Sequence, residues 1–136
     1  MNNRCLYRVS IKGTTVDETG RFLLSRENNG KWEFLGGGLD HGEDPIACLR
    51  REIFEETGLQ IIYVSPTPKY VITSRRLGHD TYIANIIYEI KLKDLNFVPS
   101  EECQELRYFT VDEARQVELF PNVKSFLGVY KPELHL

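Results

Sequence analysis

Apolar and polar residues alternate near the start of the chain in the pattern of a half-buried strand. Over residues 6–12, Tyr7, Val9 and Ile11 alternate with polar side chains. A period of two residues predicts a strand with one apolar face and one polar face. A turn follows, and the apolar run Phe22–Leu24 predicts a short buried strand after it. The first part of the chain is therefore predicted to be β structure.

The same reading predicts five more strands, most of them rich in β-branched and aromatic residues. They are Lys31–Phe34, Leu59–Val64, Tyr70–Thr73, Thr81–Leu92 and Leu106–Phe109. The glycine run at residues 36–38 lies between two of the apolar segments and is predicted to interrupt regular structure.

Helix signals stand between these strands. Asp44 and Pro45 suit the cap and the first turn of a helix that Gly58 would end. Thr110 and Glu113 have the spacing of a capping box, which predicts a short helix. Near the end of the chain, apolar residues at helical spacing predict one more amphipathic helix, with Val123, Phe126, Leu127 and Tyr130 on its packed face. These patterns predict one α/β domain, residues 1–136, with helices packed on a mixed sheet.

Size and charge narrow the class of protein and of partner. A chain of 136 residues and 15.8 kDa suits a single domain with a single core. Its formal net charge of -3 argues against duplex nucleic acid as a partner, because that binding needs a concentrated basic surface. A small anionic ligand held by a few local cations remains compatible with this charge.

Cysteine and histidine usage and hydropathy point to a cytoplasmic protein. We find no apolar run suited to a signal peptide or a membrane span, so no membrane partner is expected. The three cysteines are widely spaced and form no CxxC pair, which predicts reduced thiols. The three histidines lack metal-ligand spacing, so we expect them on the surface or in loops.

The predicted helix over residues 44–57 carries an unusual stripe of carboxylates. At about 100° per residue, Glu52, Glu55 and Glu56 cluster about a quarter turn from the apolar ridge rather than opposite it. Like charges three and four positions apart destabilise a helix, and Arg51 offers one positive charge against three negative ones. A divalent cation would balance the remainder, since magnesium and manganese prefer carboxylate oxygens. A solvated acidic face, used as an interaction surface, is the alternative.

Residues 37–59, with the sequence GGLDHGEDPIACLRREIFEETGL, resemble the Nudix box at every defining position. The matching residues are Gly37, Glu43, Arg51, Glu52, Ile53, Glu55, Glu56, Gly58 and Leu59. The family often has a proline just before the glycine pair, where this chain has Leu35, and we expect that difference to affect loop rigidity rather than ligands. The resemblance implies a Nudix-type αβα sandwich with a mixed sheet.

The resemblance also implies a metal site. Glu52, Glu55 and Glu56 would bind Mg²⁺, or Mn²⁺, with help from a backbone carbonyl at Gly36 or Gly37. Arg51 would orient one of the glutamates through a charge-assisted hydrogen bond. Glu43 would hold the box loop against the helix, and a role as a metal ligand is the alternative.

Several residues are candidates for substrate binding. Gly37 and Gly38 lack a Cβ atom, which lets backbone and phosphate approach closely. Arg26 ends the strand before the box, where some relatives keep a phosphate-binding arginine, and an exposed arginine is the alternative reading. Arg75 and Arg76 have the same two interpretations. The aromatic residues at positions 32, 34 and 70 could stack on a base, although strand aromatics are more often core.

The reaction also needs a carboxylate that accepts the proton of the attacking water. Glu55 and Glu56 of the box are candidates. Glu101, Glu102 and Glu105 precede the last predicted strand, a region from which a glutamate sometimes serves in the family. We favour Glu102 among them, with a solvated acidic loop as the alternative.

These features predict an enzyme, a Nudix hydrolase. It would use metal and water to cleave a diphosphate linked to another moiety in a nucleotide-type substrate. The family's substrates include nucleoside triphosphates, oxidised purine nucleotides, ADP-ribose, nucleotide sugars and dinucleoside polyphosphates, and no further motif selects among them. The alternative is a non-catalytic Nudix-fold module that binds or senses a nucleotide. Because dimers are frequent in the family, a homodimer is also among the expectations.

Overall fold

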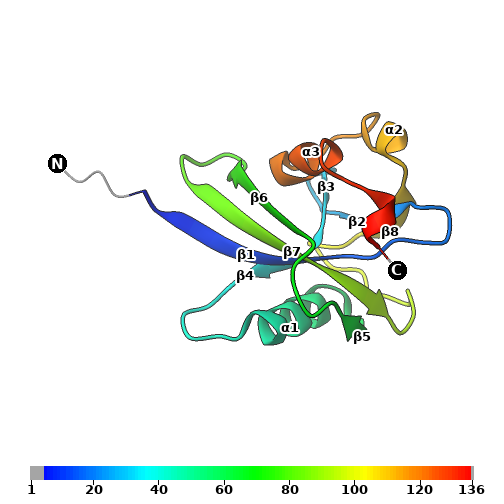
Figure 1. Cartoon of the computed structure of the whole chain (residues 1–136), viewed down its shortest axis with the longest axis horizontal. Coiled ribbons are helices and arrows are strands. Elements are labelled where there is room, and N and C mark those ends of the chain that lie inside the picture. Colours follow the sequence, from blue (N-terminus) through cyan, green and yellow to red (C-terminus); the bar gives the residue numbers. More distant parts are fainter. Residues whose placement is uncertain (1–4, 136) are drawn as a thin grey trace.

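A mixed sheet of five strands forms the centre of this computed structural model, which describes residues 5–135 (Figure 1). Its strands are β1 (Tyr7–Thr14), β4 (Leu35–Gly38), β5 (Ile61–Val64), β6 (Tyr70–Arg75) and β7 (Tyr82–Leu92). The order is β4-β1-β7-β5, and β6 also pairs with β7. The sheet is mixed because β1 and β7 run parallel, whereas the other pairs are antiparallel.

A second sheet has three antiparallel strands in the order β3-β2-β8. They are β2 (Phe22–Arg26), β3 (Trp32–Glu33) and β8 (Glu105–Phe109). The helices are α1 (Pro45–Thr57), α2 (Val111–Ala114) and α3 (Pro121–Leu127), followed by the 3-10 turn η1 (Pro132–Leu134). In Figure 1, α1 lies on one side of β1 and β7, and α2 and α3 lie on the other. The predicted α/β sandwich with a mixed sheet is confirmed, and each predicted strand is present within two residues of its expected ends.

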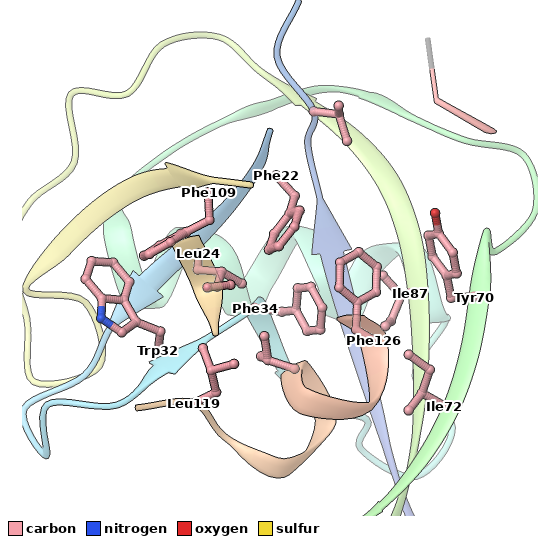
Figure 2. Close-up of a cluster of buried hydrophobic side chains, with 13 residues drawn as sticks. Phe22, Leu24, Trp32, Phe34, Tyr70, Ile72, Ile87, Phe109, Leu119 and Phe126 are labelled. Carbon is pink, nitrogen blue, oxygen red and sulfur yellow. The ribbon is translucent and has the colours of Figure 1, made fainter. Parts of the chain in front are cut away.

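The structure has two hydrophobic clusters rather than the single core expected from chain length, because the central sheet separates them. Aromatic rings dominate the first cluster (Figure 2). Phe126 of α3 meets Phe34 and Phe22 edge to face, with centroids 4.9 and 5.2 Å apart. Trp32 and Tyr70 are buried in the same cluster, so the prediction that these aromatic residues belong to the core is confirmed.

The second cluster attaches α1 to the central sheet. Leu49 and Ile53 of the helix are fully buried against Ile11 of β1 and Ile90 of β7. Burying each of these side chains stabilises the fold by about 1.5–3 kcal/mol. The predicted apolar ridge therefore fixes which face of α1 turns toward the sheet.

Local sequence signals set the ends of α1 as predicted. The Asp44 side chain accepts hydrogen bonds from the backbone N–H groups of Ile46 and Ala47, both at 3.1 Å. Gly58 ends the helix with a left-handed backbone, φ 74°. The capping box of Thr110 and Glu113 is also present at α2.

The expectation that the glycine run interrupts regular structure is wrong. Leu35–Gly38 forms β4, which pairs antiparallel with β1 over four residue pairs. Gly36 lies opposite Lys12 and has a φ of 121°, a conformation that favours glycine. Strand formation here depends on a distant partner strand, which local composition does not reveal.

The remaining expectations concern cysteines, histidines and membrane spans. Cys5 is exposed, whereas Cys48 and Cys103 are buried, and all three thiols are free. Burial raises the pKa of Cys48 to about 11 and that of Cys103 to about 12. His135 lies in the loop after η1, which is one of the two expected placements, but its side chain is 1% exposed and lies 2.8 Å from the Tyr70 hydroxyl, so it is not a surface residue. None of the described helices has the length and hydropathy needed to cross a membrane.

Candidate active site

A cleft of about 660 Å³ lies between α1, the edge strand β4, the β6–β7 turn and the first residues of α3. A larger hollow, about 1050 Å³, lies over Val16–Gly20 and η1. The smaller cleft is the candidate active site because Glu52, Glu56 and the glycines of β4 meet the loop carboxylate Glu102 there.

Five carboxylates line one part of this cleft, and we call them the acidic wall. They are Glu27, Glu33, Glu52, Glu56 and Glu102. Burial of the Glu27 carboxyl, with help from the nearby charge of Glu33, raises its pKa to about 7. The wall thus gathers box residues from α1 with residues from the β2 and β8 sides of the molecule.

Glu56 is the most deeply placed glutamate of the box stripe. Its side chain accepts a hydrogen bond from the Gly36 N–H at 3.0 Å, and only 6% of the residue is exposed. Burial raises the pKa of Glu56 well above its usual value, Lys12 opposes the shift, and the Glu102 carboxylate adds to it. Glu56 and Glu102 are therefore close neighbours, although 46 positions separate them in the sequence.

Arg51 connects the box loop to the carboxylate stripe. Its guanidinium forms two hydrogen bonds with Glu43, at 2.8 and 2.9 Å, and donates to Glu52 at 3.0 Å and Glu55 at 3.3 Å. The paired bonds from Arg51 lower the pKa of Glu43 to about 2. Glu55 is 58% exposed at its side chain and does not line the cleft, whereas Glu52 does.

Two glycines of β4 make room for charged side chains. A Cβ atom at Gly37 would collide with the Glu52 carboxylate, and one at Gly38 would collide with the Arg8 guanidinium. Successive residues of a strand face opposite sides, so β4 admits an acid on one side and a base on the other. Close approach to charged groups is thus built into this strand.

Lys12 is a site residue that sequence reasoning missed. Its Nζ donates to the Gly36 carbonyl at 3.1 Å and lies 3.7 Å from the Glu33 carboxylate. Burial alone would lower the pKa of Lys12, but the nearby carboxylates, first Glu33 and then Glu56, outweigh burial and raise it. The available signal was the polar face of β1, which faces the cleft here rather than open solvent.

Arginine and histidine side chains line the opposite part of the cleft, and we call them the basic rim. They are Arg8, Arg75, Arg76 and His79. Arg75 donates to the His79 carbonyl at 3.0 Å and forms an ion pair with Asp80. Within residues 5–135, neither Arg8 nor Arg76 has a side-chain hydrogen bond or an ion pair, so both guanidinium groups are available to an anion.

Two asparagines, also missed by sequence reasoning, lie on the floor of the cleft. Asn122 donates to the Glu33 carboxylate at 2.8 Å and to the Asn85 side chain at 3.1 Å. Asn85 in turn donates to the Ile72 carbonyl at 2.9 Å. This chain of bonds links the start of α3 to β7, β6 and the acidic wall.

The structure brings some predicted site residues together and not others. Those at the cleft are Gly36, Gly37, Gly38, Glu52, Glu56, Arg75, Arg76 and Glu102. Arg26 does not reach it, because its side chain bonds Glu105 at 3.3 Å and Gln104 at 3.1 Å. Arg26 faces Glu105 in the β2–β8 ladder, so the next residue, Glu27, lines the cleft instead.

The donor set suits a hard divalent cation. Glu52 and Glu56 supply carboxylate oxygens, and Gly36 supplies a carbonyl, the ligand types that Mg²⁺ and Mn²⁺ prefer. Burial disfavours the charged form of Glu56, and a bound cation would reverse that effect. Among the described residues, no three His, Cys, Asp or Glu side chains already converge on a metal position. Glu52 and Glu55 would therefore have to turn from Arg51 toward a bound ion.

Known proteins resemble this chain in sequence and in fold. The sequence model of the NUDIX domain family matches residues 6–128 of this chain. A MutT-like protein of Streptomyces ambofaciens is 41% identical over 71 residues, covering 52% of this chain and 46% of that protein. An RNA pyrophosphohydrolase of Actinobacillus succinogenes is 33% identical over 82 residues, covering 55% of this chain and 42% of that protein. The matched part spans less than half of either relative.

A solved structure extends the likeness of fold to most of the chain. The crystal structure of the MutT protein from Methanosarcina mazei Go1 superposes with a TM-score of 0.76 and covers 94% of this chain and 95% of that one. Sequence identity is 21%, so this likeness concerns the fold alone.

Proposed function

The chain belongs to the NUDIX domain family, and on that premise we propose that it is a metal-dependent hydrolase of phosphoanhydride bonds in nucleotide-type substrates. The names of its relatives support this reading, since one is a pyrophosphohydrolase. The observation that carries the proposal is the division of the cleft into an acidic wall and a basic rim. A diphosphate needs cations for its own charge and a carboxylate to accept a proton, and this cleft offers both.

The reaction is attack by water on a phosphorus atom. A bond forms between the water oxygen and that phosphorus, and the anhydride P–O bond breaks, with its electron pair leaving on the departing phosphate. Bound Mg²⁺ or Mn²⁺ would neutralise phosphate charge and help to align the attack. Glu52 and Glu56 would hold the ion with the Gly36 carbonyl, and Glu55 would join them once freed from Arg51.

One further glutamate and three arginines have roles in this proposal. Glu102 accepts the proton of the attacking water, because it lines the cleft beside Glu56. Arg51 is a positioning residue that sets the Glu52 and Glu55 side chains through its hydrogen bonds. Arg8 and Arg76 bind the phosphate oxygens that do not react, since both lack partners among the described residues.

A panel of substrates tests the proposal. Nucleoside triphosphates, ADP-ribose, nucleotide sugars, dinucleoside polyphosphates and a 5′-triphosphorylated oligoribonucleotide would be assayed for release of phosphate or mononucleotide. We expect turnover of at least one compound with Mg²⁺ or Mn²⁺, and none after metal is stripped with EDTA. Undiminished turnover in excess EDTA would refute the metal dependence. Tight binding of one compound without turnover of any would favour the non-catalytic module.

A further inference from the structure

A buried ammonium group lies where the acidic wall meets the box. Lys12 is 7% exposed, and its Nζ is 3.1 Å from the Gly36 carbonyl and 3.7 Å from Glu33. Glu52 and Glu56 are near enough for their charges to act on it. The carbonyl that the box would offer to a metal thus already binds a cation that belongs to the chain.

The position of Lys12 is not explained by a need to join β1 to β4. The two strands already pair over four residue pairs, and Lys12 and Gly36 are one of them. Burying an ammonium group is costly unless nearby charges compensate, so an apolar side chain would serve strand pairing better. The charge of Lys12 is therefore the property that fits this place.

Lys12 and Arg51 bracket the box glutamates. Arg51 binds Glu52 and Glu55 from the side of the box loop. Lys12 approaches from β1, beside the Gly36 carbonyl, whose N–H group binds Glu56. The glutamate stripe of α1 therefore has two cationic side chains of the chain itself beside it.

We propose that Lys12 is a resident cation of the metal site. It holds the Gly36 carbonyl and the acidic wall together when no metal is bound. Its positive charge also neutralises part of the negative charge of the site, which lowers the affinity of the site for divalent ions. This inference rests on the proposed metal dependence. In this arrangement the site needs less added positive charge to become neutral, because the chain supplies some of its own.

Metal binding without substrate tests the charge of Lys12. Mn²⁺ binding to the metal-stripped full chain would be measured by calorimetry or electron paramagnetic resonance. Mildly alkaline buffer limits proton competition for the carboxylates. Lys12→Met should bind Mn²⁺ at least about tenfold more tightly, since a positive charge beside the ligands is removed. Lys12→Arg keeps the charge and should stay near wild type.

The matched control is Lys31→Met, which removes the same charge from a side chain that does not line the cleft. Lys31 pairs with Glu118 at 2.8 Å and does not line the cleft, so its removal should leave Mn²⁺ affinity unchanged. An affinity of Lys12→Met equal to that of wild type, or weaker, would overturn the proposal.

Thermal melting gives an independent readout. Lys12→Met should melt at a lower temperature than wild type in EDTA. Saturating Mn²⁺ should reduce this difference in melting temperature, because the ion replaces the lost positive charge. A lysine that only joined two strands would cost the same stability in both conditions. If Lys12→Met does not fold in either condition, Lys12→Gln, which keeps a donor for the Gly36 carbonyl, is measured against the same criteria.

The outcomes separate this inference from the proposed function. A wild-type protein that neither binds Mn²⁺ nor hydrolyses any phosphoanhydride would refute the proposed function and the role of Lys12 with it. A wild-type protein that does both, beside a Lys12→Met variant with unaltered affinity, would refute only the role of Lys12.

Discussion

The two sides of the cleft are built in opposite ways. The acidic wall has its central members on α1 and beside β4, where Glu56 is nearly buried and bonded to backbone. The basic rim depends largely on the turn between β6 and β7, where Arg75, Arg76 and His79 are exposed. Glu56 is held by packing and a hydrogen bond, whereas the rim residues and the loop carboxylate Glu102 are open to solvent.

This difference suggests a division of labour. Groups that must meet reacting atoms need a fixed geometry, and buried side chains on a helix provide it. Groups that recognise a charged substrate can sit on a surface turn, because a guanidinium on a long side chain adapts to its anion. We therefore expect substitutions in the wall to act on turnover and substitutions in the rim to act on binding.

The largest effect should come from the proposed proton acceptor. Glu102→Gln removes the acceptor while keeping the shape of the side chain, so kcat should fall by about two to four orders of magnitude. The control is Glu101→Gln, because Glu101 is exposed and does not line the cleft. Steady-state rates at saturating substrate would be compared. A Glu102→Gln variant within a few-fold of wild type would move the role to a box glutamate.

Glu56→Gln should separate catalysis from stability. Activity should fall at least about a hundredfold, because the variant loses a charge that holds the metal and orients water. The metal-free fold should be as stable as wild type or slightly more stable. Burial raises the pKa of Glu56, so the charged form is disfavoured there, and a glutamine oxygen can still accept from the Gly36 N–H. Melting curves in EDTA measure the stability of the two proteins, and initial rates in Mg²⁺ measure their activity. Lost stability with retained activity would make Glu56 a structural residue.

The basic rim should show the opposite signature in kinetics. Arg76→Ala removes a guanidinium that has no side-chain partner within residues 5–135, so KM should rise by about tenfold while kcat changes little, the pattern expected when a binding contact is lost. Arg26→Ala is the matched control, since Arg26 bonds Glu105 and stays outside the cleft. Equal effects of the two substitutions would remove the contrast between wall and rim.

The smallest effect concerns the ion pair between Arg51 and Glu43. Arg51 lowers the pKa of Glu43 from 4.5 to about 2. A lowered folded-state pKa favours the charged form, so this contribution to stability is present above pH 4.5 and is lost as pH falls toward 2. Glu43→Gln should therefore lose less stability than wild type on acidification across that range. Chemical unfolding at several pH values would measure how the free energy of unfolding of each protein changes with pH. The same pH dependence in both proteins would contradict this role of the Arg51–Glu43 pair.

Local signals predicted α1 and its surroundings well. Asp44 and Gly58 cap the helix at the expected places, and Leu49 and Ile53 are buried as the apolar ridge requires. Caps and helical periodicity depend on residues within a few positions of one another, so the sequence contains them directly.

Features that depend on distant segments were not visible in the sequence. The glycine run forms a strand by pairing with β1, and the polar face of β1 lines a cleft together with residues of α1, α3 and the β6–β7 turn. Lys12 was missed for that reason. The alternation of side chains along β2 reversed another expectation, since a shift of one residue puts Glu27 in the cleft and Arg26 outside it.

The three thiols differ in exposure, which should allow selective chemical labelling of one of them. The thiolate is the reactive form of cysteine, and the raised pKa values of Cys48 and Cys103 keep these buried thiols protonated. Cys5 is exposed and stands three positions before Arg8 of the basic rim. A maleimide dye should therefore attach at a single position without any engineered cysteine. Fluorescence from that position, three residues before Arg8, would test whether a ligand reaches the basic rim.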